Sequence, residues 1–342
     1  MNLRLLKSGA AAKIAAMPAL PTATHDLLRL TTRVASMYHE RGIGQARIAE
    51  QLGLSQARVS RLLKQAEQLG IVKITVHVPE GVHAEDEAKL EDHYGLDEVI
   101  LVEVDETALR DDEAMARALA STGASYLELI APSLESIGVS SWSSTLLAAV
   151  NAMRPTIPGE TKTIVQVLAG VGVPSAQRFA TRLTERLAQL SKAEPIFMLA
   201  PGVVETKAAK RALLADASCR QAMERFDSLS ALLAGIGAIP PSRMLRESGN
   251  VFTDQDLEDL KQAGAVGDVC MRFYDAAGRH VKTSFDERVI GISTEQIKST
   301  RRRIGVAGGR RKFEAIRAAS RGGWISTLIT DLETGQRLLK QP

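Results

Sequence analysis

The chain has 342 residues, of which 45% are hydrophobic, and a formal net charge of +3. This length and apolar content predict two globular units, one of them large, and exclude both a single small domain and a disordered chain. No apolar run reaches the roughly 18 residues that a membrane helix needs, which excludes a membrane-spanning protein.

Cysteine and histidine usage excludes two further classes of protein. The two cysteines, Cys219 and Cys270, have no CxxC spacing and cannot form a disulfide framework, so we expect a reducing cytoplasm as the location. The six histidines are scattered, and none forms an HxxxH pair or a His/Cys cluster. The sequence therefore predicts neither a metal site nor a cofactor.

The N-terminal part of the chain is basic, although the whole is nearly neutral. Residues 1–78 contain eleven Lys and Arg against four Asp and Glu, whereas the remainder contains 32 against 36. Such a basic unit favours a polyanionic partner, because each neutralised phosphate releases counterions. Lys7 and Lys13 interrupt the apolar stretches at the start of the chain, so we expect a flexible basic tail over residues 1–24 rather than a secretory signal.

Residues 25–78 are predicted to form a helix-turn-helix domain. Apolar residues recur at helical spacing over 26–41, and Gly42 and Gly44 then break the chain. In the following stretch, 45–65, Ala49 is small where two helices must cross closely, Gly53 suits a tight turn, and Ser55 is placed to cap the second helix. An ordinary helical hairpin would not require small residues at both positions, so the pattern indicates a helix-turn-helix.

The second helix of this motif has a polar face that suits double-stranded DNA. We expect Gln56 to pair with adenine, Arg58 or Arg61 with guanine, and the remaining polar groups to contact phosphate. A β-branched run follows Gly70 and predicts a short strand or wing that closes the domain at residue 78. The predicted DNA-binding residues are Arg47, Ser55, Gln56, Ala57, Arg58, Ser60, Arg61 and Lys64.

Residues 79–96 are predicted to connect this domain to the rest of the chain. Pro79 and Gly81 end the preceding strand, and an acidic helical stretch follows. We therefore place the domain boundary near residue 80 and expect a linker helix before residue 97.

Residues 97–342 alternate between apolar, β-rich runs and helical stretches. This alternation predicts a Rossmann-like α/β domain with a mainly parallel sheet that is covered on both faces. No repeat of 20 to 50 residues is present. The predicted strands are 98–104, 136–142, 163–170, 195–200, 231–239, 268–275, 289–293, 302–309 and 324–331.

Several of these strands end in small or polar residues, at 140–145, 169–177, 235–242 and 307–316. In an open α/β sheet, ligands bind beyond the carboxyl ends of the strands, so this set of endings predicts a ligand crevice. At any single loop the alternative is that glycine merely allows a tight turn. A serine nucleophile is not predicted in "GVSSW" at 138–142, because Trp142 occupies the position where a nucleophile elbow needs its second glycine.

Over residues 26–340 the chain resembles the SorC family of sugar-responsive bacterial transcriptional regulators. The resemblance is carried by the helix-turn-helix at 45–65 and by "GVSSWSSTL", "APGVVE", "GIGAI", "AGAVGDVCMRFYDAAGRHV", "VIGIS" and "VAGGRRKFEAIRAA". It implies an N-terminal DNA-binding domain and an effector domain at 97–342 that is related to sugar-phosphate isomerases. It also implies a homotetramer and a phosphorylated sugar or sugar-like effector.

The resemblance also implies which residues bind the effector. The family's loop after the strand at 136 is usually glycine-rich and cradles a phosphate; Gly138 and Thr145 match it, whereas serines fill its middle. Lys312 matches a phosphate-facing lysine and Asp268 a position that binds sugar hydroxyls, while Trp142 suits either a sugar face or the core. An unphosphorylated sugar or polyol therefore stays open. The implied residues are Gly138, Ser140, Ser141, Trp142, Ser143, Thr145, Gly170, Gln177, Asp268 and Lys312.

The sequence thus predicts a DNA-binding regulator controlled by a sugar, polyol or sugar phosphate, and not an enzyme. The alternatives are a sugar-phosphate isomerase or deaminase with an attached DNA-binding head, and a constitutive DNA-binding protein. An isomerase needs an acid/base set at the cleft, and the strand-end loops show no Asp/His/Glu grouping that would serve.

Overall fold

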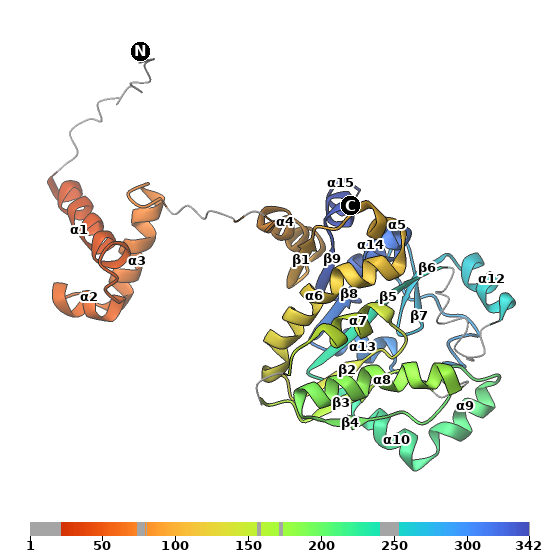
Figure 1. The fold of residues 1–342 in the computed structure, drawn as a ribbon. Helices are drawn as coiled ribbons and strands as arrows, with labels where there is room; N and C mark the ends of the chain where they lie inside the picture. The colour runs from red at the N-terminus through yellow and green to blue at the C-terminus, as the bar shows by residue number, and fades with distance from the viewer. Residues whose placement is uncertain are drawn as a thin grey trace, which may run out of the picture. The chain divides into compact units, whose positions relative to one another are not determined.

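The computed structural model describes residues 22–73, 79, 81–155, 159–170, 174–239 and 253–341, with side chains from residue 26 onward and, in the helix at 174–191, from residue 181 onward. Two compact units make up the chain, Met1–His77 and Val78–Pro342 (Figure 1). Most of the expected tail at 1–24 and of the expected wing at 71–78, namely residues 1–21 and 74–78, lies outside the described residues. The last three residues expected in the tail, 22–24, instead begin the first helix, because helical structure starts at Thr22. None of the helices in these ranges is long and apolar enough to span a bilayer.

The first unit contains three helices, α1 (Thr22–His39), α2 (Gln45–Leu52) and α3 (Gln56–Gln68). Gly53 ends α2 in the left-handed conformation, with φ +63°, and the Ser55 side chain accepts a hydrogen bond from the Arg58 N–H at 3.3 Å. The predicted turn and cap between the two helices are thus present. The buried core of the unit consists of Val34, Met37, Ile48, Ala49, Val59, Leu62 and Leu63.

The second unit is built on one sheet, in which the described residues supply nine strands (Figure 1). Seven strands pair in parallel in the order β1-β9-β8-β5-β2-β3-β4, and β6 and β7 extend β5 as an antiparallel hairpin. The predicted α/β fold with a mainly parallel sheet is confirmed. The strands are β1 (Glu98–Val102), β2 (Ser136–Val139), β3 (Thr163–Gln166), β4 (Glu194–Ile196), β5 (Ala231–Ala238), β6 (Ala265–Val269), β7 (Arg272–Asp275), β8 (Arg302–Val306) and β9 (Thr327–Asp331).

Helices cover both faces of this sheet because its strands are apolar on both faces. Along β5, Leu233 packs into one buried cluster with α6, α7 and α8, whereas Leu232 packs into another with α4, α14 and α15. The described helices of the unit are α4 (Ala84–Tyr94), α5 (Glu106–Arg110), α6 (Asp112–Ile130), α7 (Ser144–Ala152), α8 (Pro174–Ser191), α9 (Lys207–Leu214), α10 (Ala217–Glu224), α12 (Asp254–Gln262), α13 (Thr294–Ser299), α14 (Phe313–Arg321) and α15 (Leu332–Lys340).

Helix α4, expected as a linker, packs on the edge of the sheet. Leu90 of α4 is fully buried, and the Glu87 and Glu91 carboxylates each accept a backbone hydrogen bond from β1 at 2.9 Å, from Leu101 and Val99 respectively. These carboxylates satisfy N–H groups that an edge strand would otherwise leave open to another chain. The helix is therefore an integral part of the second unit.

Two predicted strands have a different structure. The single strand predicted at 268–275 is a hairpin, in which Cys270 and Met271 form the two-residue turn between β6 and β7 with φ +53° and +59°. Turns of this kind usually contain Gly, Asn or Asp, so the sequence carried no turn signal there. The strand predicted at 289–293 is limited to two isolated bridges, Val203–Val289 and Leu168–Gly291.

Candidate functional site

The predicted DNA-binding residues are all exposed on the first unit. Arg47 lies on α2, Ser55 caps α3, and the other six are exposed residues of α3, whose buried side carries Val59 and Leu62. Within the described part of the chain, Arg58, Arg61 and Lys64 form no ion pair. Three cations on one exposed helix face, without carboxylate partners, can neutralise phosphates or reach base edges.

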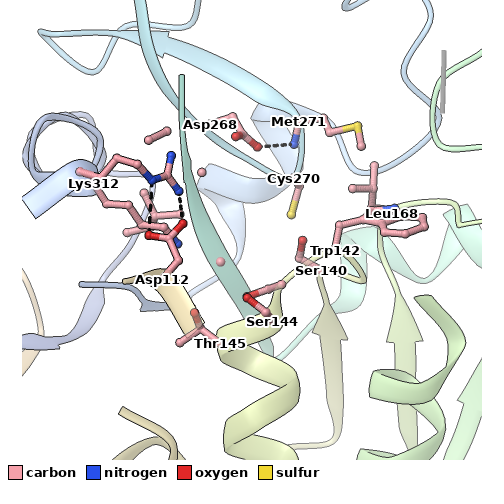
Figure 2. A pocket seen from close by; sticks show the side chains of 16 residues that line it. Asp112, Ser140, Trp142, Ser144, Thr145, Leu168, Asp268, Cys270, Met271 and Lys312 are labelled. Atoms are coloured by element: carbon pink, nitrogen blue, oxygen red, sulfur yellow. Dashed lines mark hydrogen bonds and ion pairs between the residues drawn. The ribbon is translucent and has the colours of Figure 1, made fainter. Parts of the chain in front are cut away.

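A cavity of about 70 Å³ lies in the second unit where β2 and β5 end (Figure 2). Its wall comes from the loop between β2 and α7, the end of β5, the β6–β7 turn, the start of α6, and the short 3₁₀ helix η3 (Arg310–Lys312). This is the carboxyl edge of the parallel strands, where open α/β sheets bind ligands. Of the four small-residue strand endings, the structure brings those after β2 and β5 to the cavity, together with Arg311 and Lys312 of the ending at 307–316. Part of the ending at 169–177 lies outside the described residues.

Six of the ten predicted effector-binding residues line this cavity, namely Ser140, Trp142, Ser143, Thr145, Asp268 and Lys312. Gly138 instead lies within β2, where a Cβ atom would come within 2.7 Å of the side chains of Val167 and Leu229. Ser141 donates its hydroxyl hydrogen bond to the Leu168 carbonyl at 3.2 Å, and Gly170 is buried away from the cavity lining. The side chain of Gln177 lies outside the described residues.

The loop between β2 and α7 is fixed by its own polar groups. The Ser143 hydroxyl caps α7 by accepting from the Leu146 N–H at 3.2 Å. The Trp142 indole donates to the Ala169 carbonyl at 3.3 Å, and its ring both packs against a buried apolar cluster and lines the cavity. Trp142 thus forms a fixed apolar wall.

Asp268 enters the cavity from β6. Its Oδ2 atom accepts from the Met271 N–H at 2.9 Å (Figure 2). Burial raises its pKa to about 6, although the Met271 N–H and the charge of Lys312 act in the opposite direction. Its side chain crosses β5 over Gly237, where an added Cβ atom would lie 1.9 Å from Oδ1.

Lys312 faces Asp268 from η3. Burial lowers the pKa of its ammonium group, and within the described ranges this group has no ion-pair partner within 4 Å. The loop before it is held by Asp331, a fully buried carboxylate that accepts from the Gly309 N–H at 2.8 Å and from the Thr334 N–H and hydroxyl at 2.8 and 2.7 Å. Asp331 therefore positions the segment that carries Lys312.

The structure adds cavity residues that the sequence did not identify. Gly235 and Gly237 belong to the small-residue strand ending at 235–242, for which the sequence predicts a ligand crevice but no individual binding residue. Asp112 starts α6 and pairs with Arg311 of η3; the dashed lines that end at the labelled Asp112 in Figure 2 mark this pair. No sequence signal connects residues 199 positions apart. The other added residues are Ser144, Leu168, Ile236, Ala238, Cys270 and Met271.

The turn residues Cys270 and Met271 have strained backbone conformations in the cavity wall. Both adopt the left-handed conformation that side chains disfavour. The Ser140 hydroxyl lies within hydrogen-bonding reach of the Cys270 thiol, and burial raises the pKa of that thiol to about 12. The turn is thus held by side-chain contacts from Ser140 and Asp268. Among the described residues, no three His, Cys, Asp or Glu side chains come together to hold a metal ion.

Comparison with known proteins finds relatives along most of the chain. Residues 81–340 match the Sugar-bind family model, a sugar-binding domain. The chain is 28% identical to the sorbitol operon regulator of Klebsiella pneumoniae over 319 residues, which is 92% of this chain and 99% of the relative. It is also 28% identical to the deoxyribonucleoside regulator of Bacillus subtilis (strain 168), over 91% of this chain and 97% of that protein.

A solved structure agrees with these sequence matches. The crystal structure of the full-length sorbitol operon regulator from Klebsiella pneumoniae aligns with a TM-score of 0.68 and 27% identity. The alignment covers 91% of this chain and 98% of the other. The similarity therefore extends beyond the residues matched by the family model.

Proposed function

We propose a function on the premise that this chain belongs to the SorC family of sugar-binding transcriptional regulators. It is a transcriptional regulator whose DNA binding is controlled by a sugar-type effector. The observation that supports this best is that the strand-end cavity, with its hydroxyl groups, Asp268 and Lys312, lies within the part of the chain that matches the sugar-binding family. The same chain carries an exposed cationic helix face, without ion pairs among the described residues, in a separate compact unit.

In this proposal α3 reads double-stranded operator DNA in the major groove. Gln56 pairs with adenine and Arg58 or Arg61 with guanine, which suits the donors and acceptors of these side chains. Ser60, Lys64 and Arg47 contact phosphates and fix the register of the helix on the duplex. The exposure of all of these side chains supports the assignment.

The effector acts through linkage. The chain works as a homotetramer in the cytoplasm, where its operator lies, and its assembly sets the spacing of the DNA-binding units. An effector that binds the cavity better in one arrangement of the tetramer favours that arrangement. Half-sites at a fixed spacing then gain or lose simultaneous contact with two units.

The enzymatic alternative has one structural point in its favour, since Asp268 and Lys312 both line the cavity and have pKa values shifted towards neutrality. The relatives are nevertheless named as regulators. We therefore expect no turnover of sugar phosphates, and robust turnover that is lost in Asp268→Ala would contradict this assignment.

The test of the DNA-binding role uses Arg58→Ala and Arg61→Ala in the full chain. Duplexes are first selected by the wild type from a random-sequence pool, and affinities are then measured by gel shift. Each variant should bind about 10-fold more weakly or worse, because a bidentate contact to guanine contributes roughly 1–3 kcal/mol. Arg33→Ala is the matched control, since it removes an exposed cation of α1. Unchanged affinity in both α3 variants would refute the recognition-helix assignment.

A further inference from the structure

Whether the cavity favours a phosphorylated or an unphosphorylated effector depends on how many of the three consecutive cations of η3 are free to bind it. Arg310 forms ion pairs with Glu333 and Glu106, at 2.7 and 2.8 Å. Arg311 forms a two-pronged pair with Asp112. Of the three cations of η3, only Lys312 has an ammonium or guanidinium group without an ion pair in the described part of the chain. A ligand therefore meets a single available cation.

That cation faces a carboxyl group across the same cavity. Asp268 uses Oδ2 to accept from Met271, and no hydrogen bond to Oδ1 is formed within the described residues. The other titratable groups that interact with Asp268 are Cys270 and Tyr274 of the hairpin. A hydroxyl group can donate to Oδ1 and accept from Lys312, and so satisfies both groups without adding charge.

The charged groups of the cavity wall are already balanced. Asp112 and Asp268 stand against Arg311 and Lys312, two acids against two bases. A phosphate ester would add nearly two negative charges to this partly desolvated site, and only Lys312 and the N-terminal N–H groups of α7 would be left to offset them. Two carboxylates would lie along the same cavity and repel it.

The remaining polar surface consists of hydroxyl groups. Thr145 is only 4% exposed, and among the described residues its hydroxyl has no hydrogen-bond partner, although the residue lines the cavity. Ser144 is exposed at the first turn of α7, next to it. The Trp142 ring, which lines the same cavity, offers an apolar face of the kind that C–H groups of a carbon chain contact.

We infer that the effector is an uncharged polyhydroxylated compound, a polyol or an unphosphorylated sugar, which donates a hydroxyl to Asp268 and accepts from Lys312. This inference rests on the proposed function, because it assumes that the cavity is the effector site. The cavity of about 70 Å³ is smaller than the roughly 300 Å³ or more of ligand pockets in general, so binding also has to widen it.

The test compares matched pairs on the full-length protein. Erythritol, ribitol, D-sorbitol, D-ribose and D-glucose are each run beside their monophosphate esters, first by thermal shift and then by calorimetry. At least one uncharged compound should stabilise the protein, and its ester should bind about 10-fold more weakly or not at all. A preference for the ester, or no response to any compound in the panel, would overturn the inference.

Two variants separate the contribution of charge from that of hydrogen bonding. Asp268→Asn should weaken the uncharged compound about 10-fold, because the amide replaces an acceptor that carries charge. Lys312→Gln keeps a donor and should cost only about 3-fold, whereas a phosphate ester would lose about 100-fold or more. Asp92→Asn, which removes an exposed carboxyl group of α4, is the control.

Affinity for the uncharged compound should also rise as the pH increases through about 6, because only the carboxylate form of Asp268 can accept a hydrogen bond with both of its oxygen atoms.

These results differ from those that would refute the regulator itself. If an uncharged compound binds the cavity and leaves the gel-shift affinity for the selected duplex unchanged, effector control fails while the ligand class stands. If an ester binds with Lys312-dependent affinity and shifts DNA binding, the regulator stands and the ligand class is wrong.

Discussion

The exposed cationic face of α3 and the strand-end cavity both contain charged side chains, but they place them in opposite surroundings. On α3 the cations are exposed and have no carboxylate partner among the described residues. In the cavity Asp268 and Lys312 are withdrawn from water, and Arg311 is tied to Asp112. The exposed charges stay available to a highly charged polymer, whereas the cavity has little free charge to offer a ligand.

The same contrast predicts where the molecule is sensitive to substitution. A polar group that is exposed on α3 can lose its partner to water at little cost in stability. A buried polar group cannot, because removing one partner leaves the other unsatisfied. Substitutions in and behind the cavity should therefore lower the free energy of unfolding more than comparable substitutions on α3, and the following predictions test this difference.

The largest effect is expected at Asp331. Asp331→Ala removes three hydrogen bonds from a fully buried carboxylate and leaves the Gly309 N–H unsatisfied. The free energy of unfolding should fall by about 3–5 kcal/mol in urea titrations. Fluorescence is a suitable signal, because Trp142 and Trp324 both lie in the second unit.

The matched control is Asp105→Ala, which removes an exposed aspartate that caps α5 through the Ala108 N–H at 2.8 Å. Its cost should be about 1 kcal/mol. Equal losses of stability in the two variants would show that burial does not determine the cost of removing an aspartate.

The two capping residues Ser55 and Asp331 differ in how well the sequence predicts their roles. Ser55 was predicted correctly, because a cap and the helix that it starts are adjacent in the sequence. The structural role of Asp331 was not predicted, because it bonds a loop 22 residues earlier that only the pairing of β8 with β9 brings close. The order of elements and the parallel sheet followed from local apolar patterns. The β6–β7 turn did not, since Cys270 and Met271 adopt positive φ angles that their residue types disfavour.

The cavity residues divide in the same way. Asp268 and Lys312 were identified through the family motifs around them, and the structure places both in the cavity wall. Asp112 and its pairing with Arg311 carry no local signal, because the contact joins the start of α6 to η3. Sequence patterns therefore identified cavity residues on strand ends, and missed those contributed by distant segments.

The second prediction concerns Gly237, which allows Asp268 to cross β5. Gly237→Ala would place a Cβ atom 1.9 Å from Oδ1 and 2.9 Å from Cγ of Asp268, a side chain already held by the Met271 N–H. We expect a loss of about 1–3 kcal/mol in urea unfolding together with weaker effector binding. Gly44→Ala is the control in the first unit, since nothing lies within 4 Å of its added Cβ atom and its φ of −63° suits alanine. Because Gly44 is the N-cap of α2, where alanine is less favourable than glycine, this control should cost up to about 1 kcal/mol, but it should leave effector binding unchanged.

The third prediction tests the exposed side of the comparison. Ser55→Ala removes the cap of α3, and the Arg58 N–H can then bond to water, so the loss should be about 1 kcal/mol. Amide hydrogen exchange, measured by mass spectrometry, should become faster in peptides from 45–68 and stay unchanged in peptides from 136–150. Slower exchange at the start of α3, or a loss that equals that of Asp331→Ala, would contradict the contrast between the two regions.

The last prediction is the pH dependence of stability that Asp268 introduces. Burial raises its pKa to about 6 in the folded protein, so between about pH 4 and 6 the folded state binds a proton that the unfolded chain has released. Stability from this group is therefore complete below pH 4 and is lost as the pH rises through 6. In Asp268→Asn this loss is absent, so the Tm of the variant should gain about 6 °C relative to the wild type between pH 4 and 7.

The first unit supplies the internal control for this titration. Its described carboxyl groups are all exposed, namely Asp26, Glu40, Glu50 and Glu67. Differential calorimetry at each pH should therefore place the wild-type-to-variant difference in the unfolding of the second unit. If the two Tm curves run parallel from pH 4 to 7, Asp268 does not titrate in this range. Its carboxylate would then be as accessible to water as the groups around α3, and the contrast between the two regions would not extend to this group.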